Sequence, residues 1–234
     1  MSKAVHLTDT MLIARQNTVL EQFFNDAGGG PGFAIAGDTT AVVDGGGVSN
    51  ATAASANAEA SMSADSAVFS YGNGVSAQLR WVVDYTEANT DDAEVYIGMH
   101  SATVADTLGD SSAGPPADYS GFGFFKLAGG TTLSIEVANG TAHTTVQLTA
   151  TNSLTSAAIT TGAGTLQEFG VDIIEKTATK ADVILLVDGV AVYKITDQDM
   201  TSISACRPVA FIKATDTNAE TLNTYYCGFV ASRS

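Results

Sequence analysis

The stretch from Lys180 to Thr196 reads KADVILLVDGVAVYKIT and decides the fold. Its centre, Asp188-Gly189, lies between two runs of aliphatic and β-branched residues. This dipeptide is typical of a two-residue hairpin turn in which both residues have positive φ. The stretch therefore predicts a β-hairpin in which Val187 faces Val190, with Leu185 opposite Val192 and Ile184 opposite Tyr193.

Both faces of this hairpin are apolar. A strand pair of this kind needs cover on each side, so we expect it at the centre of a sheet whose second face is also covered. The expectation has a direct test in the burial of the second face. The side chains that should be buried as deeply as Leu185 and Val192 are Ile184, Leu186, Tyr193 and Ile195.

Alternating apolar and polar residues predict further strands along the chain. The clearest run, from Val75 to Tyr85, reads VSAQLRWVVDY, and Asn139-Gly140 gives a second hairpin signal. Residues 50–66 are rich in Ala and Ser and predict a weak strand or a loop. The pattern predicts an all-β fold, an antiparallel two-sheet jelly-roll sandwich. The other strands are predicted near 93–100, 119–127, 132–137, 143–148, 168–173, 206–213 and 222–231.

The N-terminal segment has a different period. From Leu7 to Phe24 apolar residues recur at spacings of three and four, which predicts a helix, with an extended arm as the alternative. A glycine-rich run ending at Gly32 breaks regular structure. We therefore expect residues 1–32 to form an N-terminal helix or arm and linker, and residues 33–234 to form the sandwich domain.

Composition excludes several partners. The chain has 234 residues and a net charge of −15, with only 10 Lys and Arg, which disfavours nucleic acid and anionic membranes. The opening MSKAVHLTDTML lacks the apolar core of a signal peptide, so we expect synthesis in the cytoplasm.

Cys206 and Cys227 are too few for a disulfide framework. If the last two strands pair, however, Cys206 lies opposite Cys227, which leaves a disulfide open.

No arrangement of residues predicts catalysis. A nucleophilic triad needs a histidine near a Ser or Cys elbow, but no G-x-S-x-G occurs. His100 and His143 fall on the polar faces of predicted strands, where we expect solvated side chains. Glycoside hydrolysis needs paired carboxylates on one face, and Glu175 falls on the opposite face from Glu168 and Asp172. We therefore expect a protein that is not an enzyme.

One loop offers weak metal ligands. Asp91 and Asp92 lie in an acidic loop after the first long strand, and Ca²⁺ prefers oxygen ligands from flexible loops. The spacing does not match an EF-hand, so solvated carboxylates are the preferred interpretation, and we expect no cofactor. The only tryptophan, Trp81, lies on the apolar side of its strand. We expect it in the core rather than on a sugar-stacking surface.

The chain resembles the concanavalin A-like or laminin G-like jelly roll. The resemblance rests on VSAQLRWVVDYTEANTDDAEVYIGM, FGFFKLAGGTTLSIEVANG, the hairpin with its V-D-G-V turn, and the closing YYCGFVA. The form seen here, with Ala, Gly and Thr loops, is similar to structural proteins of tailed bacteriophages, notably capsid decoration or cement proteins. It lacks the carboxylates of sugar-binding and hydrolytic relatives.

That resemblance implies a virion protein on the outside of an icosahedral capsid. It would bind the major capsid protein and neighbouring copies of itself, with a homo-oligomer on the shell as one arrangement, and stabilise the head through non-covalent contacts. The alternative is a carbohydrate- or receptor-binding module of a phage tail or fibre. The apolar residues expected to contact the partner, if they do not cover the chain's own sheet, are Met11, Leu12, Val19, Phe23 and Phe24.

Overall fold

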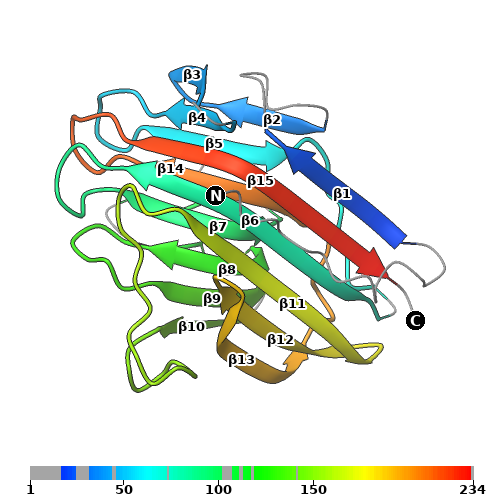
Figure 1. Cartoon of the computed structure of the whole chain (residues 1–234). Coiled ribbons are helices and arrows are strands. Elements are labelled where there is room, and N and C mark those ends of the chain that lie inside the picture. The colour runs from blue at the N-terminus through cyan, green and yellow to red at the C-terminus, as the bar shows by residue number, and fades with distance from the viewer. Residues whose placement is uncertain are drawn as a thin grey trace.

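The computed structural model describes residues 17–24, 32–43, 46–72, 74–101, 107–110, 113–116, 119–140 and 142–232. Within these ranges the chain forms two antiparallel β-sheets packed face to face (Figure 1). The predicted all-β, two-sheet sandwich is confirmed. The described part of the chain contains no helix with the length and apolar character needed to cross a membrane.

Each sheet mixes strands from distant parts of the sequence. The eight-stranded sheet contains, in spatial order, β13 (Val190–Asp199), β12 (Lys180–Val187), β11 (Gln167–Thr177), β6 (Ser76–Thr86), β15 (Thr221–Ser232), β4 (Val48–Ala51) and β3 (Thr39–Val42), with β1 (Asn17–Phe23) also paired to β15. The seven-stranded sheet contains β10 (His143–Gln147), β9 (Ser134–Asn139), β8 (Ser120–Lys126), β7 (Glu94–His100), β14 (Arg207–Lys213), β5 (Glu59–Ala64) and β2 (Phe33–Ala36).

Strand β1 corrects the expected helix. It pairs antiparallel with β15 from Asn17 opposite Ser232 to Phe23 opposite Tyr226, and the two strands run side by side in Figure 1. Because β4 pairs only with Thr221–Thr224 of β15, the rest of that edge needs partners for its backbone N–H and C=O groups. Pairing with β15 therefore outweighs the helical spacing of the apolar residues. The extended alternative holds for residues 17–23, whereas residues 7–16 lie outside the described residues.

The β12–β13 hairpin is confirmed, but its predicted place and register are wrong. Asp188 and Gly189 have φ values of 50° and 77°, as the two-residue turn requires, and Val187 pairs with Val190. Leu185, however, pairs with Tyr193, because Val192 is an extra residue that forms a β-bulge. The carbonyl of Val192 accepts a hydrogen bond from the Leu154 N–H at 2.9 Å. A contact from a distant loop therefore sets the register, which the turn dipeptide does not reveal.

The hairpin is also not covered on both sides. β13 lies at the edge of its sheet rather than at its centre. Leu185 and Val192 are buried, whereas Val190 is 54% exposed. Ile184 and Leu186, on the outer face, are only half-buried. Tyr193 and Ile195 were predicted on that face too, but the bulge places them opposite Leu185 and Val183, where they pack against the core and are half-buried as well. A hairpin with apolar residues on both faces therefore need not be fully buried here, because it lies at the edge of its sheet.

Residues 50–66 contribute more structure than expected. They include all of β5, which lies between β14 and β2 inside the seven-stranded sheet. Ala60, Met62 and Ala64 face the core, and all three are at most 1% exposed. The small side chains therefore fit a crowded strand position rather than a surface loop.

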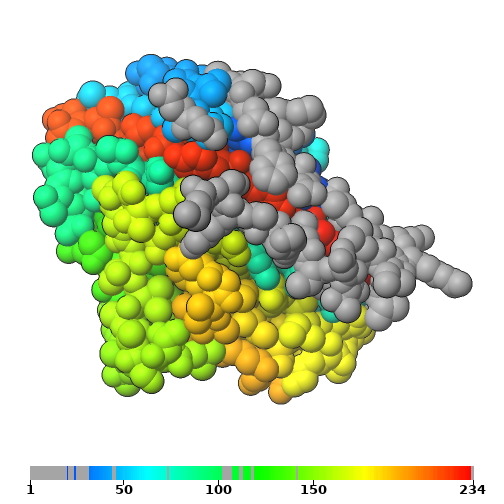
Figure 2. Space-filling view, viewed as in Figure 1, coloured from blue at the N-terminus to red at the C-terminus, as the bar shows by residue number. Residues whose placement is uncertain are grey.

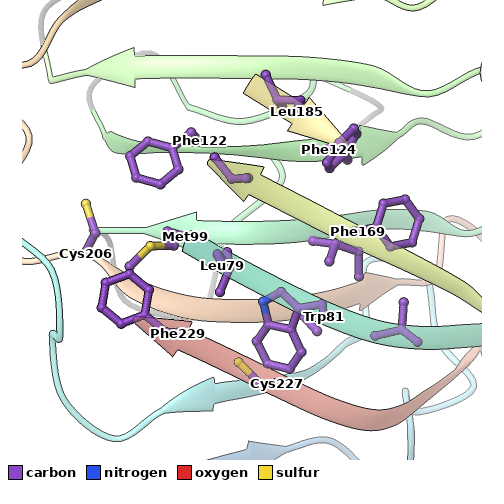
Figure 3. Close-up of a cluster of buried hydrophobic side chains, with 14 of the residues drawn as sticks. Leu79, Trp81, Met99, Phe122, Phe124, Phe169, Leu185, Cys206, Cys227 and Phe229 are labelled. Carbon is purple, nitrogen blue, oxygen red and sulfur yellow. The ribbon is translucent and has the colours of Figure 1, made fainter. Parts of the chain in front are cut away.

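The core lies between the two sheets and contains Trp81 (Figure 3). Its indole is fully buried, stacks on Phe24 with ring centroids 6.3 Å apart, and meets Phe33 edge-on at 6.1 Å. The indole Nε1 donates a hydrogen bond to the carbonyl of Gly98 at 3.3 Å. Trp81 thus joins β6 to β7 of the opposite sheet, which confirms the expected core role.

Cys206 and Cys227 are not neighbours. The last two strands do not pair, because β14 belongs to one sheet and β15 to the other. Both thiols are free and buried, and Figure 3 shows Cys206 at one end of the drawn cluster, away from Cys227. The hairpin expected at the end of the chain is instead a crossover between sheets. The geometry that would have brought the two cysteines together is therefore absent.

We expect both thiols to be chemically inert in the folded protein. Burial raises the pKa of Cys206 to about 12 and that of Cys227 well above its usual value, and only the thiolate is a good nucleophile. Iodoacetamide at pH 8 should therefore modify neither cysteine in native buffer and both in guanidinium chloride, as measured by intact mass. Rapid native labelling of either cysteine would contradict the packing described here.

Candidate functional site

Several loops adjoin at one end of the sandwich. Residues 87–93 connect β6 to β7, residues 214–220 connect β14 to β15, and residues 160–166 precede β11. Figure 2 shows parts of these loops together at the left edge of the molecule. The Asp92 carbonyl accepts a hydrogen bond from the Thr215 hydroxyl at 2.8 Å, which joins the first two of these loops. The Asp91 carbonyl accepts from the Gly129 N–H at 2.8 Å, which adds the loop between β8 and β9. The loop end is therefore a connected surface rather than separate turns.

An open cleft of about 480 Å³ lies in this surface. Asn89 links two of the loops, because its side-chain amide donates to Asp216 Oδ2 at 2.7 Å. The Asp91 carboxylate, the Asn89 amide and the Thr90 hydroxyl can exchange hydrogen bonds with a polar ligand, whereas the Glu87 carboxylate is 5% exposed and turned toward Lys126. The residues that line the cleft are Glu87, Ala88, Asn89, Thr90, Asp91 and Ala163.

The cleft has an acidic surrounding. Glu220 is fully buried nearby, and its Oε2 accepts a hydrogen bond from the Ala88 N–H at 3.1 Å. Burial raises the pKa of Glu220, and the negative charges of Glu87, Asp216 and Asp92 raise it further. The electrostatic field at this end of the molecule therefore disfavours anionic ligands.

The candidate calcium ligands lie in this loop. Asp91 lines the cleft and has a φ of 62°, and the Asp92 carbonyl is held by Thr215. Among the described residues, no group of three or more His, Cys, Asp or Glu side chains is placed to hold a metal ion. The neighbouring Glu87 carboxylate instead contacts the Lys126 ammonium at 2.7 Å. A calcium site at Asp91 and Asp92 thus gains no further carboxylate from the described residues.

The predicted partner-contact residues are not gathered into a described surface. Met11 and Leu12 lie outside the described residues. Val19 and Phe23 belong to β1, whose pairing with β15 is given above, and their side chains are not described. Phe24 is fully buried between the two sheets against Trp81 and Phe33. Its ring therefore covers the chain's own core and is not accessible to a partner.

One of the two histidines that were predicted to be solvated is buried instead. His143 is exposed, as predicted, but His100 is fully buried on the outer face of the seven-stranded sheet. Its ring stacks on Tyr119 with centroids 4.1 Å apart and meets Tyr96 edge-on. The glycine at position 121 makes room for this packing, because a Cβ there would approach Tyr119 Cε2 to 2.8 Å. The face of the strand that the sequence predicted to be solvated therefore carries buried aromatic rings.

The carboxylates of β11 also have a structural role. Asp172 forms an ion pair with Arg80 at 2.7 Å, and Glu168 lies 3.7 Å from the same guanidinium. Arg80 lies across Gly170, where a side chain would meet it. These two acids therefore share one guanidinium on the surface of the eight-stranded sheet.

The cleft lacks a stacking surface among the described residues. No described Trp, Tyr or Phe side chain is exposed, since Trp81 is in the core and the least buried tyrosines, Tyr193 and Tyr225, are half-buried. The polar groups of the lining are hydrogen-bonding groups. The acidic loop was noticeable in the sequence, but nothing there indicated that Asn89 and Thr90 would line a cleft with Ala163.

Solved structures with the same arrangement of strands include several sugar-binding proteins. Lectin II from Ulex europaeus has a TM-score of 0.60 and 10% identity, covering 92% of this chain and 99% of its own. The carbohydrate recognition domain of Emp47p has a TM-score of 0.58 and 11% identity, covering 90% and 95%. The fold is a legume-lectin-like jelly roll.

A bacteriophage protein shares this fold. A conserved carbohydrate esterase of the Shiga toxin-encoding bacteriophage phi24B has a TM-score of 0.55 and 12% identity, covering 93% of this chain and all of its own. No protein-family model and no curated protein matches the sequence. At sequence identities this low, the structural similarity establishes only the fold, which is the predicted jelly roll. Any proposal about function must come from the geometry of the site.

Proposed function

We propose that this protein is a carbohydrate-binding module of a phage tail or fibre, which binds a glycan in the loop-end cleft without catalysis. The observation that carries the proposal is the cleft itself. Its volume of about 480 Å³ lies within the range typical of small-molecule sites. The carboxylate of Asp91, the amide of Asn89 and the hydroxyl of Thr90 supply both donors and acceptors for sugar hydroxyls.

The charge of the site narrows the class of glycan. Asp91, Asp216 and Glu220 surround or line the cleft, whereas Glu87 is paired with Lys126, and the whole chain carries a net charge of −15. An anionic sugar would meet like charges on approach. The proposed ligand is therefore a neutral or amino sugar within a surface polysaccharide, rather than a uronic or sialic acid.

The similar structures support this proposal by fold. They include a plant lectin, a carbohydrate recognition domain and a phage carbohydrate esterase. The capsid decoration predicted from the sequence uses the same fold, but it has no counterpart among the similar structures named above. Binding of the major capsid protein on the outside of a virion therefore remains a prediction from sequence resemblance.

The test is a glycan array probed with the purified chain, with and without CaCl₂. We expect binding to neutral or amino-sugar glycans, reduced about tenfold or more by Asp91→Asn, because one charged acceptor is lost. Asparagine tolerates the positive φ of this position, so the loop should keep its shape. The experiment also distinguishes a calcium-dependent site, for which CaCl₂ would be required.

A matched control removes the same charge elsewhere. Asp65 is exposed after the last residue of β5, at the end of that strand remote from Lys213 and the loop end. Asp65→Asn should leave glycan binding unchanged. If the array shows no binding, or if both variants reduce it equally, the proposed cleft is not the binding site. Retention of the protein by intact phage heads would then favour capsid decoration.

A further inference from the structure

The ammonium group of Lys126 is completely enclosed beneath the loop end. Lys126 is the last residue of β8, and its side chain is 0% exposed. Its Nζ lies 2.7 Å from Glu87 Oε1, 2.7 Å from the Ala93 carbonyl and 3.3 Å from the Asp91 carbonyl. The face of the Tyr85 ring lies 5.9 Å away. A single cation thus collects oxygen atoms from three positions of one loop.

The same carboxylate also holds the backbone of that loop. Glu87 Oε1 accepts a hydrogen bond from the Ala93 N–H at 3.1 Å, and Glu87 Oε2 accepts from the Asp91 N–H at 3.3 Å. Residues 87–93 therefore wrap around the ammonium, with a carboxylate and two carbonyls pointing inward. Buried ion pairs persist only when further hydrogen bonds complete the geometry, and these contacts do so.

We propose that the ammonium group of Lys126 takes the place of a bound cation and fixes the conformation of residues 87–93. These residues form most of the cleft. Its surroundings are those of a bound cation: one carboxylate, two carbonyl oxygens and an aromatic face, all screened from water. The N···O distances of 2.7 Å exceed the roughly 2.3–2.6 Å of Ca²⁺–oxygen bonds. The space therefore suits an ammonium or a large monovalent cation rather than calcium.

A second lysine shows the same arrangement at another loop. Lys213, 1% exposed, contacts Asp110 Oδ1 at 2.6 Å and the Leu108 carbonyl at 3.1 Å. This ammonium joins β14 to residues 107–110, as Lys126 joins β8 to residues 87–93. A loop carboxylate and a loop carbonyl around a buried lysine thus occur twice in the described structure. The contacts of Lys126 are more complete, because its carboxylate partner is also enclosed.

Substitution of Lys126 gives a specific test. Lys126→Ala should leave a vacant space with its oxygens in place, whereas Lys126→Met should fill the space with an uncharged chain. In choline chloride, the amides of Asp91 and Ala93 should exchange with deuterium about tenfold or more faster in both variants. Methylammonium or potassium chloride at equal ionic strength should slow this exchange in Lys126→Ala and leave Lys126→Met unaffected.

A double variant protects the test from simple misfolding. Lys126→Met with Glu87→Gln contains no charge at this position, so it should keep a folded core even if the single variants do not. Amides of β6 and β15 report on that core. The proposal is wrong if the loop amides of the folded double variant stay as protected as in the wild type. It is also wrong if choline restores Lys126→Ala as well as methylammonium does.

These measurements use no ligand for the cleft. A negative result therefore leaves the proposed carbohydrate binding untouched, and the absence of glycan binding leaves the role of Lys126 untouched.

Discussion

Replacing Trp81 with alanine is expected to lower the free energy of unfolding by about 3–5 kcal/mol, the cost of deleting a large buried aromatic side chain. Trp81 is fully buried and contacts Phe24, Phe33 and the carbonyl of Gly98 on the opposite sheet. The deletion would therefore loosen the joint between the sheets. Guanidinium unfolding should be followed by circular dichroism, because the variant contains no tryptophan.

The control for this prediction is Trp81→Phe. It keeps an aromatic ring against Phe24 and Phe33 but removes the hydrogen bond from Nε1. We expect it to cost about 1–2 kcal/mol, from the lost hydrogen bond and imperfect filling of the space. A loss below about 1 kcal/mol for the alanine variant would show that this part of the core is not well packed.

Replacing Glu136 with glutamine is expected to stabilise the protein above pH 7 and leave it unchanged near pH 4. Glu136 lies on β9, is 2% exposed, and has His143 Nδ1 3.8 Å away. Burial raises its pKa to about 7, although a hydrogen bond with Thr145 partly opposes the rise. The folded state therefore holds a proton that the unfolded chain releases at about pH 4.5.

The direction of the pH dependence follows from the proton that the folded state holds and the unfolded chain releases. Stability from the protonated carboxyl is fully present below about pH 4.5, and it is lost as pH rises through about 7. The ideal loss is roughly 3 kcal/mol, which residual solvent screening reduces to about 2 kcal/mol. Glutamine cannot ionise, so the advantage of Glu136→Gln should grow from zero near pH 4 to about 2 kcal/mol at pH 8.

The measurement compares urea unfolding of the two proteins from pH 4 to pH 8. The difference between them is decisive, because Glu220, whose pKa burial also raises, gives both proteins a slope of the same sign. Besides Thr145 and His143 from β10, Tyr96 and Tyr119 lie near enough for the charge of Glu136 to raise their pKa values. Repeating the pair in His143→Gln removes the contribution of that imidazole. A constant difference across the pH range would contradict the raised pKa.

Local pattern was sufficient to predict the class of fold. Alternation predicted β6, β7 and β11, and the Asp188-Gly189 dipeptide predicted the turn with both φ values positive, because these features depend only on neighbours in sequence. Features that depend on distant partners were mispredicted. β1 is a strand because β15 has an open edge, and Val192 is bulged because Leu154 donates to its carbonyl.

The site was predictable only in part. The run from Glu87 to Asp92 is visibly acidic, and this charge drew attention to the loop that lines the cleft. Its partners come from other loops and from β8, so neither the cleft with Ala163 nor the burial of Lys126 follows from local spacing. A lysine at the end of a strand normally suggests a solvated side chain. Only the fold brings Lys126 under the loop.

Strand β15 pairs with β6, β4 and β1, so residues from both ends of the described chain meet in one sheet. Asn17 pairs with Ser232, and no local hairpin brings these residues together. Such non-local pairing requires the chain to lose conformational entropy before the stabilising contacts form. This requirement slows folding to milliseconds or longer. We therefore expect the eight-stranded sheet to assemble late, once residues 221–232 are free to insert between β6 and β1.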